Sequence, residues 1–388
     1  MTEVRELTND QLEVAGRLTA LAFGSAADVT PERLRRWQDE HVVAPRLGAF
    51  DGDRLVATAQ IRPYRQWYLG RTVPVGGIGG VAVAPADRGR GIASDLMRAL
   101  LPRMRAAGQV ISVLYPSVPG LYRRTGWETA GTLTEFEFAP AALAAVPVPD
   151  PAVRIREAGK DDVETVVYLY QKVGEQGTGL FTRDGPMFSA DELLTLDGVV
   201  IAERDGQACG YTSYTREVGR LVVHDLICDD LAAGAALLRH LASWGTVTKT
   251  LRMRVLDPDL LTFALPLPLG APVYVDRWMA RIVDAGPAMA ARGWPDGLAI
   301  SIDLDVTDPD APWNAGRYRL VIADGEAQWE PGGTGAVGVH IRALASLYSS
   351  YASAAALRRA GLLTGEPADL AAVDAAFAGP RPQLLDAF

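Results

Sequence analysis

An apolar strand, a loop of glycine and arginine, and a helix follow one another between residues 79 and 106. This succession restricts the fold more than any other part of the sequence. The strand is predicted over 79–83, the loop reads Arg88-Gly89-Arg90-Gly91-Ile92-Ala93, and the apolar spacing predicts a helix over 92–106. Another apolar strand is expected over 110–114. Because the helix joins two buried strands, we predict an α/β domain with a mixed sheet.

A helix and two hairpins are expected before this loop. Apolar residues from Leu12 to Ala22 recur at helical spacing, and Asn9 or Asp10 is the predicted N-cap. Each hairpin closes at a glycine, with strands expected over 47–50 and 55–61 and over 66–70 and 72–83.

A weaker copy of this pattern follows a segment rich in proline and alanine, which is typical of a linker. Arg5-Glu6 with Asp10 returns as Arg156-Glu157 with Asp161, and the sequence Asp-Gly returns at Asp205-Gly206 before further strands and a helix over 231–244. The pattern indicates a duplication. The alternative is that two unrelated α/β units share Asp-Gly hairpins. We predict two α/β units over 1–140 and 153–285, a linker over 141–152 and a third domain over 286–388.

The third domain has a different pattern, which predicts an α+β fold. Strands are expected over 298–306, 316–322 and 336–339, and helices over 344–351, 354–360 and 367–377. We expect the terminal Phe388 to be docked against the rest of the protein, since free ends usually fray.

The loop at 88–93 is suited to phosphate oxygens. Gly89 and Gly91 let the backbone approach a ligand, the first helical turn offers free N–H groups, and Arg88 and Arg90 add positive charge. The loop lacks the Gly-Lys-Ser/Thr of a Walker loop and the third glycine of a dinucleotide fingerprint. The alternative is an ordinary strand-to-helix turn that contains glycine.

A tyrosine motif downstream supports phosphate binding. Tyr122-Arg123-Arg124-Thr125-Gly126-Trp127 gives Y-x-x-x-G-W after the 110–114 strand. The succession of strand, R-x-x-G-x-A, helix, strand and Y-x-x-x-G-W resembles the GNAT superfamily of acyl-CoA-dependent N-acyltransferases. The resemblance implies that residues 88–93 bind the pyrophosphate of acetyl-CoA and that Tyr122 faces the thioester sulfur. The coenzyme-binding residues implied in this way are Val81 and Val83, which pair with the pantetheine arm, and Arg88, Gly89, Arg90, Gly91, Ile92 and Ala93.

The whole chain is similar to the Eis family of aminoglycoside and amine acetyltransferases. The shared features are an intact GNAT unit, a degenerate second unit and a C-terminal domain similar to sterol carrier proteins. The resemblance implies that Tyr122 is the general acid, that the terminal carboxylate of Phe388 is the general base and that Ser117 contacts the coenzyme. It also implies a homohexamer.

The sequence departs from the family pattern at two places. Gly80 stands where some members have a bulky aromatic residue, which predicts a wider substrate pocket. In the second unit, residues 231–236 lack the leading arginine of the loop, so this unit is not expected to bind coenzyme A.

Acetyl transfer to an amine explains why these groups are needed. An alkylamine with a pKa near 10 is protonated at pH 7, so a base must take its proton, and the departing thiolate needs an acid. A terminal carboxylate is a weak base unless burial raises its pKa or water relays the proton. The alternatives are that Tyr122 only packs a short helix and that Phe388 is an ordinary docked terminus.

The acceptor is expected to be an amine-bearing small molecule. Trp37, Asp28 and Glu32, with Asp39 and Glu40 nearby, are candidates for a cationic substrate pocket. The alternative is a solvated acidic helix with one packing tryptophan.

Composition excludes several other classes. The net charge of -9, from 38 basic and 47 acidic residues, argues against nucleic acid and anionic membranes as partners. No segment approaches the roughly 18 apolar residues of a membrane span. The 2 cysteines and 4 histidines have no metal-ligand spacing, so we expect no metal, and a cytoplasmic location.

Two other functions remain open at this point. The C-terminal domain could carry an apolar ligand with the GNAT units as a scaffold, which would require a large apolar cavity between residues 290 and 380. A tandem-GNAT enzyme similar to mycothiol synthase or to the Fem acyltransferases is the other, although the extra domain argues against it.

Overall fold

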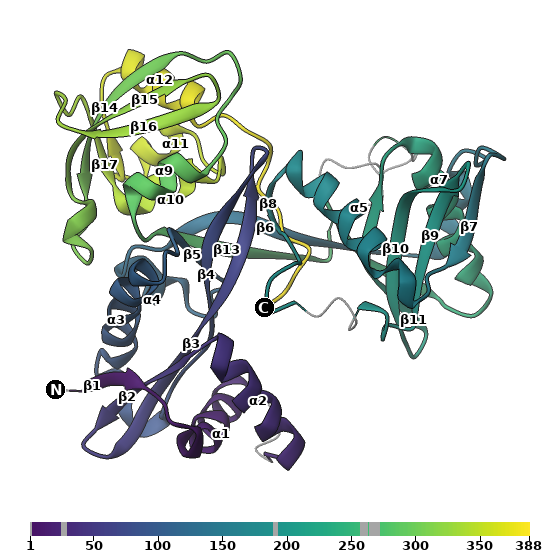
Figure 1. The fold of residues 1–388 in the computed structure, drawn as a ribbon, viewed down its shortest axis with the longest axis horizontal. Helices are drawn as coiled ribbons and strands as arrows, with labels where there is room; N and C mark the ends of the chain where they lie inside the picture. Colours follow the sequence, from purple (N-terminus) through teal and green to yellow (C-terminus); the bar gives the residue numbers. More distant parts are fainter. Residues whose placement is uncertain (1, 25–28, 189–192, 257–262, 264–271) are drawn as a thin grey trace.

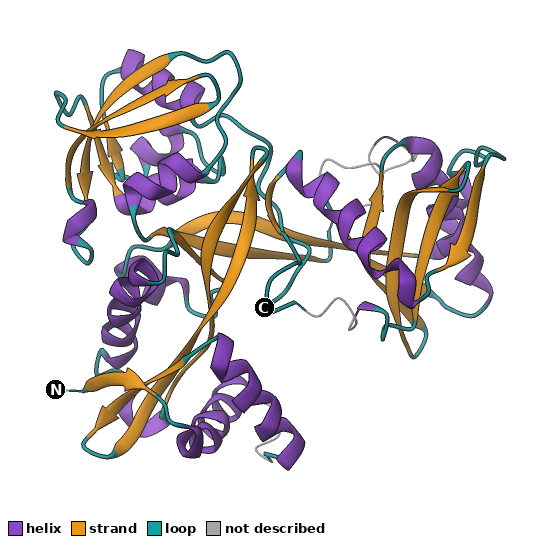
Figure 2. Ribbon diagram, viewed as in Figure 1, coloured by secondary structure: helices purple, strands orange, loops and turns teal. Residues whose placement is uncertain are grey.

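The computed structural model describes residues 2–24, 29–188, 193–256, 263 and 272–388, and its ribbon has three parts around a central chain terminus (Figure 1). Two of these parts share one sheet of 13 strands, and the third has a separate sheet of 5 strands (Figure 2). The predicted combination of mixed α/β units and an α+β domain is confirmed.

The N-terminal unit contains the predicted hairpins and the predicted helix after the glycine loop. The first turn of the chain differs, because Thr8, and not Asn9 or Asp10, is the capping residue. The backbone N–H of Thr8 donates to Gln11 Oε1 (3.1 Å), and residues 9–11 form a short 3-10 turn ahead of the first helix. The elements are β1 (Glu3–Glu6), α1 (Leu12–Phe23), α2 (Pro31–Val43), β2 (Arg46–Asp51), β3 (Arg54–Tyr68), β4 (Arg71–Val83), α3 (Ile92–Ala106), β5 (Ile111–Leu114) and α4 (Pro119–Arg124).

The second unit repeats the hairpin and the strand–helix–strand order of the first. Asp205 and Gly206 join its central hairpin with positive φ angles of 52° and 76°, as a tight two-residue turn requires. The elements are β7 (Val153–Glu157), α5 (Val163–Glu175), β8 (Thr178–Phe181), β9 (Gly198–Arg204), β10 (Gln207–Glu217), β11 (Arg220–Cys228), α7 (Leu231–Ser243) and β12 (Thr250–Val255).

The two units interlock through strands that the sequence pattern did not reveal. β13 (Tyr274–Ile282) belongs to the second unit by its position in the chain but lies between β5 and β6 (Glu128–Phe138) of the first unit. β6 in turn pairs with β12 of the second unit. A division of the chain at one residue therefore does not separate the two units in the folded structure. The expected linker is also partly ordered, as a 3-10 helix over Pro140–Ala145 that buries Leu143.

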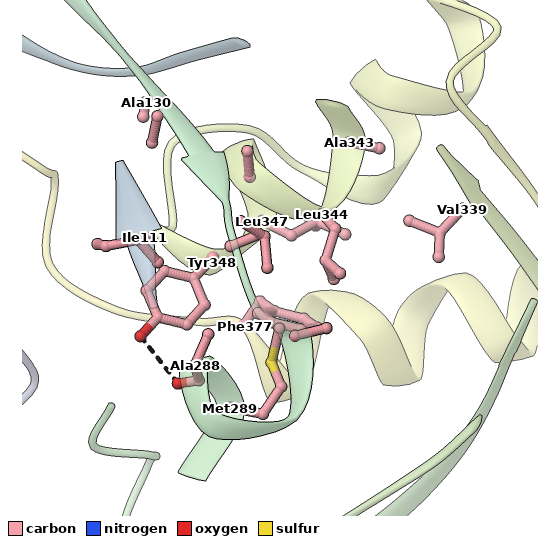
Figure 3. Close-up of a cluster of buried hydrophobic side chains, with 14 of the residues drawn as sticks. Ile111, Ala130, Ala288, Met289, Val339, Ala343, Leu344, Leu347, Tyr348 and Phe377 are labelled. Carbon is pink, nitrogen blue, oxygen red and sulfur yellow. Dashed lines mark hydrogen bonds between the residues drawn. The ribbon is translucent and has the colours of Figure 1, made fainter. Parts of the chain in front are cut away.

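The C-terminal domain packs four helices against its sheet. Its core continues into the first unit, and Figure 3 shows the part where Ile111 and Ala130 lie near Tyr348, which donates a hydrogen bond to the carbonyl of Ala288 (2.9 Å). The sheet residues Ile302, Leu304 and Leu320 are each at most 4% exposed and belong to this core. The elements are α9 (Ala285–Ala291), β14 (Ile300–Thr307), β15 (Gly316–Ala323), β16 (Glu326–Pro331), β17 (Val337–His340), α10 (Ile341–Tyr348), α11 (Ala354–Arg359), β18 (Leu363–Thr364) and α12 (Pro367–Ala376).

Candidate active site

A groove of about 790 Å³ runs along β4, past the start of α3 and over α4. Of the nine residues predicted to bind the coenzyme, the structure places all except Arg90 along this groove. They are Val81, Val83, Arg88, Gly89, Gly91, Ile92, Ala93 and Ser117, and Tyr122 lies there too.

The groove exists because β4 separates from β5. The two strands pair from Val75 to Gly77 only, so the backbone of β4 beyond Gly77 has no strand on this side within the described chain. A bulge interrupts β4 at the same place. Gly80 and Val81 stand where β3 provides only Ala59, and Gly80 has the positive φ of 59° that this type of bulge requires. The exposed edge can therefore pair with an extended ligand arm.

The glycine loop is open to a ligand. Gly89 and Gly91 have φ angles of 79° and 83°, and a Cβ atom at either position would meet nothing within 4 Å. Arg88 lines the groove, with Nε near the Val83 carbonyl (3.5 Å). The Arg90 guanidinium instead binds Asp87 (2.6 Å) and Asp51 (3.3 Å). Of the two arginines predicted to add positive charge at the loop, Arg88 lines the groove and Arg90 does not.

The tyrosine motif adds a second arginine to the groove. Arg124 lines it, whereas Arg123 binds Glu128 (3.0 Å) on the other side of α4. Arg124 is therefore the member of this pair that can reach a phosphate.

Tyr122 carries a phenol that lines the groove. It is 4% exposed on α4, and burial raises the pKa of its phenol above the ordinary value of 10.0, while a hydrogen bond with Ser117 opposes this shift. The phenol is therefore protonated at neutral pH, as a general acid must be.

The C-terminal tail reaches this site along a fixed path. The backbone N–H of Leu384 donates to the Thr132 carbonyl (2.9 Å), and the N–H of Gln383 donates to the Thr178 carbonyl (2.9 Å). Gly179 gives the tail room, because a Cβ atom there would lie 2.4 Å from the Gln383 carbonyl oxygen. The tail thus runs between β6 of the first unit and β8 of the second.

A buried charge network holds Asp386. Arg183 Nε donates to Asp386 Oδ1 (3.0 Å), and both Nη atoms of Arg183 bind the carboxylate of Asp225 (2.8 and 2.9 Å). The Tyr170 hydroxyl donates to Asp386 Oδ2 (2.9 Å). Sequence reasoning missed this network. Arg183, Asp225 and Tyr170 belong to the second unit, which carries no coenzyme loop, and Asp386 belongs to the C-terminal tail.

Phe388 is docked, as expected. Its ring contacts Tyr64, Tyr115 and Phe181 at centroid distances of 5.2–5.5 Å. Figure 1 shows the C-terminus in the middle of the molecule, where the three parts meet. The second unit and the tail therefore contribute to the site of the first unit.

A second cavity of about 370 Å³ meets the groove at Val81, Ser117 and Tyr122, and Phe388 lines this second cavity. Trp37 lines it, as predicted for a substrate residue. Glu32 is exposed on the first turn of α2 and does not line it, and Asp28 lies outside the described residues. The charged side chains that line it are Arg33, Arg46 and Arg62, and no acidic side chain of the described residues is among its lining residues.

The second unit has no comparable phosphate site. The carboxylate of Asp230 caps α7 by accepting from the Ala233 N–H (2.9 Å), and Arg204 holds it (2.8 Å). This contact lowers the pKa of Asp230 to about 2. A negative charge thus occupies the position that a phosphate would need.

Other candidate chemistry is weak in the described part of the chain. It holds no group of three or more His, Cys, Asp or Glu that could bind a metal ion, and none of its helices is long and apolar enough to cross a membrane. His41 and His340 bind backbone groups, at Leu7 O (2.8 Å) and the Arg342 N–H (3.2 Å).

Fold and groove together define a tandem GNAT acetyltransferase with a sterol carrier protein domain. Residues 3–130 and 157–282 match the family described as "Acetyltransferase (GNAT) domain", and residues 286–385 match "Sterol carrier protein domain". The chain belongs to the Eis family of GNAT N-acetyltransferases.

Known relatives agree with this assignment. An uncharacterized N-acetyltransferase of Streptomyces avermitilis is 31% identical, with 82% of each chain covered. The N-acetyltransferase Eis of Mycobacterium tuberculosis is 27% identical over 93% of this chain and 94% of its own. The crystal structure of a GCN5-related N-acetyltransferase from Kribbella flavida superposes with a TM-score of 0.87 at 32% identity, covering 100% of this chain and 99% of that one.

Proposed function

We propose that the protein transfers the acetyl group of acetyl-CoA directly to an amine of a small molecule, with Tyr122 as general acid and the Phe388 carboxylate as general base. The observation that carries this proposal is the junction of the two cavities. The coenzyme groove and the second cavity share Val81, Ser117 and Tyr122, so ligands in the two cavities would meet at the phenol. Bringing two substrates together supplies much of the acceleration in such a reaction.

The coenzyme fits the groove on three counts. The free edge of β4 at Val81 and Val83 can pair with the pantetheine amides, and the loop ending at Gly91 offers N–H groups at the start of α3. Arg88 and Arg124 supply the positive charge for the diphosphate.

The reaction needs no covalent enzyme intermediate. The neutral amine nitrogen attacks the thioester carbonyl carbon, and the C–N bond forms as the C–S bond breaks. The proton lost by the amine goes to the Phe388 carboxylate, directly or through water, and the thiolate takes the phenolic proton of Tyr122. The products are an amide and coenzyme A.

A thiol-release assay with acetyl-CoA and a panel of amines tests the proposal. Tyr122→Phe should lower kcat strongly without unfolding the protein. Removal of Phe388 should do the same, whereas Phe388→Leu keeps a terminal carboxylate and should retain much of the activity. A folded protein that releases no thiol with any amine, and does not bind acetyl-CoA in calorimetry, would contradict the proposal.

The acceptor class in this proposal comes from the family resemblance and not from the lining of the cavity. Aminoglycosides, polyamines and lysine-type amines are the acceptors predicted from that resemblance. Three arginines line the acceptor cavity, and they disfavour a polycation.

We also propose a homohexamer in the cytoplasm, as the family resemblance implies. Light scattering coupled to size-exclusion chromatography tests the hexamer, which would have six times the chain mass of 41.5 kDa. Cell fractionation tests the location.

A further inference from the structure

The acceptor cavity is lined by three guanidinium groups from three different elements. Arg33 comes from α2, with its Cζ 5.0 Å from the centroid of the Trp37 ring, while Arg46 begins β2 and Arg62 lies in the middle of β3. All three line the same cavity as Tyr122 and Phe388. None of the three forms a salt bridge with a carboxylate of the described chain.

Arg46 is the most deeply placed of them, at 8% exposed. Its guanidinium donates to neutral oxygens only, namely Thr19 Oγ1 (3.3 Å) and Gln60 Oε1 (3.2 Å). Burial, together with the charge of Arg62, lowers the pKa of Arg46 to about 10, and the charge of Glu40 opposes this shift. A buried cation without an anionic partner is costly, so this position is favourable for an anion.

Arg62 shares an acceptor with Arg46. Its Nε donates to the same Gln60 Oε1 (3.3 Å), so one neutral amide oxygen holds two guanidinium groups. Two like charges this close repel each other, and an anion placed between them would remove the repulsion.

The glycines of β4 leave the guanidinium groups uncovered. A Cβ atom on Gly79 would lie 3.3 Å from the Arg62 guanidinium carbon, and one on Gly80 would lie 3.1 Å from Arg46 Nη1. The side of the cavity that faces the arginines is therefore open backbone, next to the bulge that leads to Val81.

We propose that the acceptor is a small amine that also carries an oxyanion, a carboxylate or a phosphate. The oxyanion binds Arg46 and Arg62, with Arg33 at the rim, and the amine points to Tyr122 and Phe388. This inference rests on the proposed acetyltransferase function and names its acceptor class. It is the opposite of the polycationic acceptor that the family resemblance implies.

Acceptors of matched length test the inference. Hexylamine, 1,6-diaminohexane and 6-aminohexanoate differ mainly in the distal group, and shorter ω-amino acids and ω-aminoalkyl phosphates vary the spacing and the anion. Charge-assisted hydrogen bonds predict that the best anionic acceptor has a kcat/KM about tenfold to a hundredfold above its neutral match. The diamine should be the poorest.

Variants of the half-buried Arg62 separate charge recognition from folding. Arg62→Gln should lower the preference for the anionic acceptor at least about tenfold while acetyl-CoA binding in calorimetry stays unchanged. Arg17→Gln is the control, since it removes the same charge from an exposed pair with Glu13 outside the cavity and should leave the preference unchanged. Arg33→Gln gives a second test if Arg62→Gln lowers the melting temperature.

The outcomes distinguish the two proposals. If neutral amines or diamines are acetylated as well as every anionic acceptor, or if neither cavity variant changes the preference, the anionic acceptor is wrong and the acetyltransferase stands. If no amine releases thiol and acetyl-CoA does not bind, both proposals fail.

Discussion

Gly80 and Arg46 occupy adjoining space in the acceptor cavity. Gly80 has a φ of 59°, and a Cβ atom on it would lie 3.1 Å from Arg46 Nη1. The absence of a side chain at this bulge therefore does two things. It allows the left-handed backbone that exposes the edge of β4, and it leaves the Arg46 guanidinium open to the cavity.

Gly80→Ala should impair the acceptor side of the reaction more than the coenzyme side. The methyl group would crowd Arg46, and the positive φ would cost about 1–2 kcal/mol of stability for a residue with a Cβ atom. We expect a raised KM for the acceptor and a smaller change in the KM for acetyl-CoA. Gly52→Ala is the control, because Gly52 has a similar φ of 61° in a distant turn and its Cβ would contact nothing. Equal effects of both variants on the acceptor KM would contradict this prediction.

Tyr122→Phe should remove the acid that protonates the thiolate. General acid catalysis typically contributes about a hundredfold to ten thousandfold, so kcat should fall within this range while the fold is kept. The raised pKa of the phenol also sets the pH dependence. The phenol is active in its protonated form, so the wild-type rate should fall only above pH 10, and this alkaline fall should be absent in the variant. A pH–rate profile up to the limit of stability measures both effects.

Much of the fold could be predicted because local patterns determine it. The Asp51-Gly52 turn and the helix over 92–106 appear where the sequence places them, since turn residues and apolar spacing act over a few positions. β13 could not be predicted in its place, because its pairing with β5 depends on contacts about 170 residues away, which leave no local pattern. β16 was missed because only Ala327 and Trp329 carry its alternation of exposed and half-buried positions, which is too short a pattern to predict a strand.

The candidate site was predictable where it follows a motif and not where it depends on tertiary packing. The residues at 88–93 other than Arg90 lie along one groove with Tyr122, because the motif itself builds the loop and α4. Arg46 and Arg62 were missed because they belong to strands of the hairpins, and only the fold turns them toward Phe388. The acidic residues near Trp37 in the sequence gave no sign of these arginines for the same reason.

Each chain should bind one molecule of acetyl-CoA. The loop at Arg88 is open, whereas Asp230 and its partner Arg204 occupy the corresponding helix start in the second unit. Calorimetry should therefore give a stoichiometry near one per chain, and Arg88→Gln should weaken binding about tenfold or more by removing a charge-assisted contact. Arg90→Gln should weaken it less, since that guanidinium already binds Asp87. Two sites per chain would contradict the account of the second unit.

Arg183 should matter for both stability and catalysis, because it links Asp225 of the second unit to Asp386 in the tail. Arg183→Leu leaves the fully buried Asp225 without its cation, which should cost about 3–5 kcal/mol of unfolding free energy. Arg156→Gln is the control, since it breaks an exposed pair with Asp162 and should cost about 1 kcal/mol or less. Urea denaturation of both variants measures the difference.

The pH dependence of this network has a definite sign. Burial alone would raise the pKa of Asp225, but the charge and hydrogen bonds of Arg183 outweigh it and hold the pKa below the ordinary 3.8. The stabilisation is therefore present above pH 3.8 and is lost as the pH falls through the lower native value. Asp386→Asn tests the catalytic part, because it keeps the shape of the tail residue and removes its charge. We expect a lower kcat with little change in acetyl-CoA binding, since the tail contributes Phe388 to the acceptor side, and an unchanged kcat would show that Asp386 does not position the terminal carboxylate.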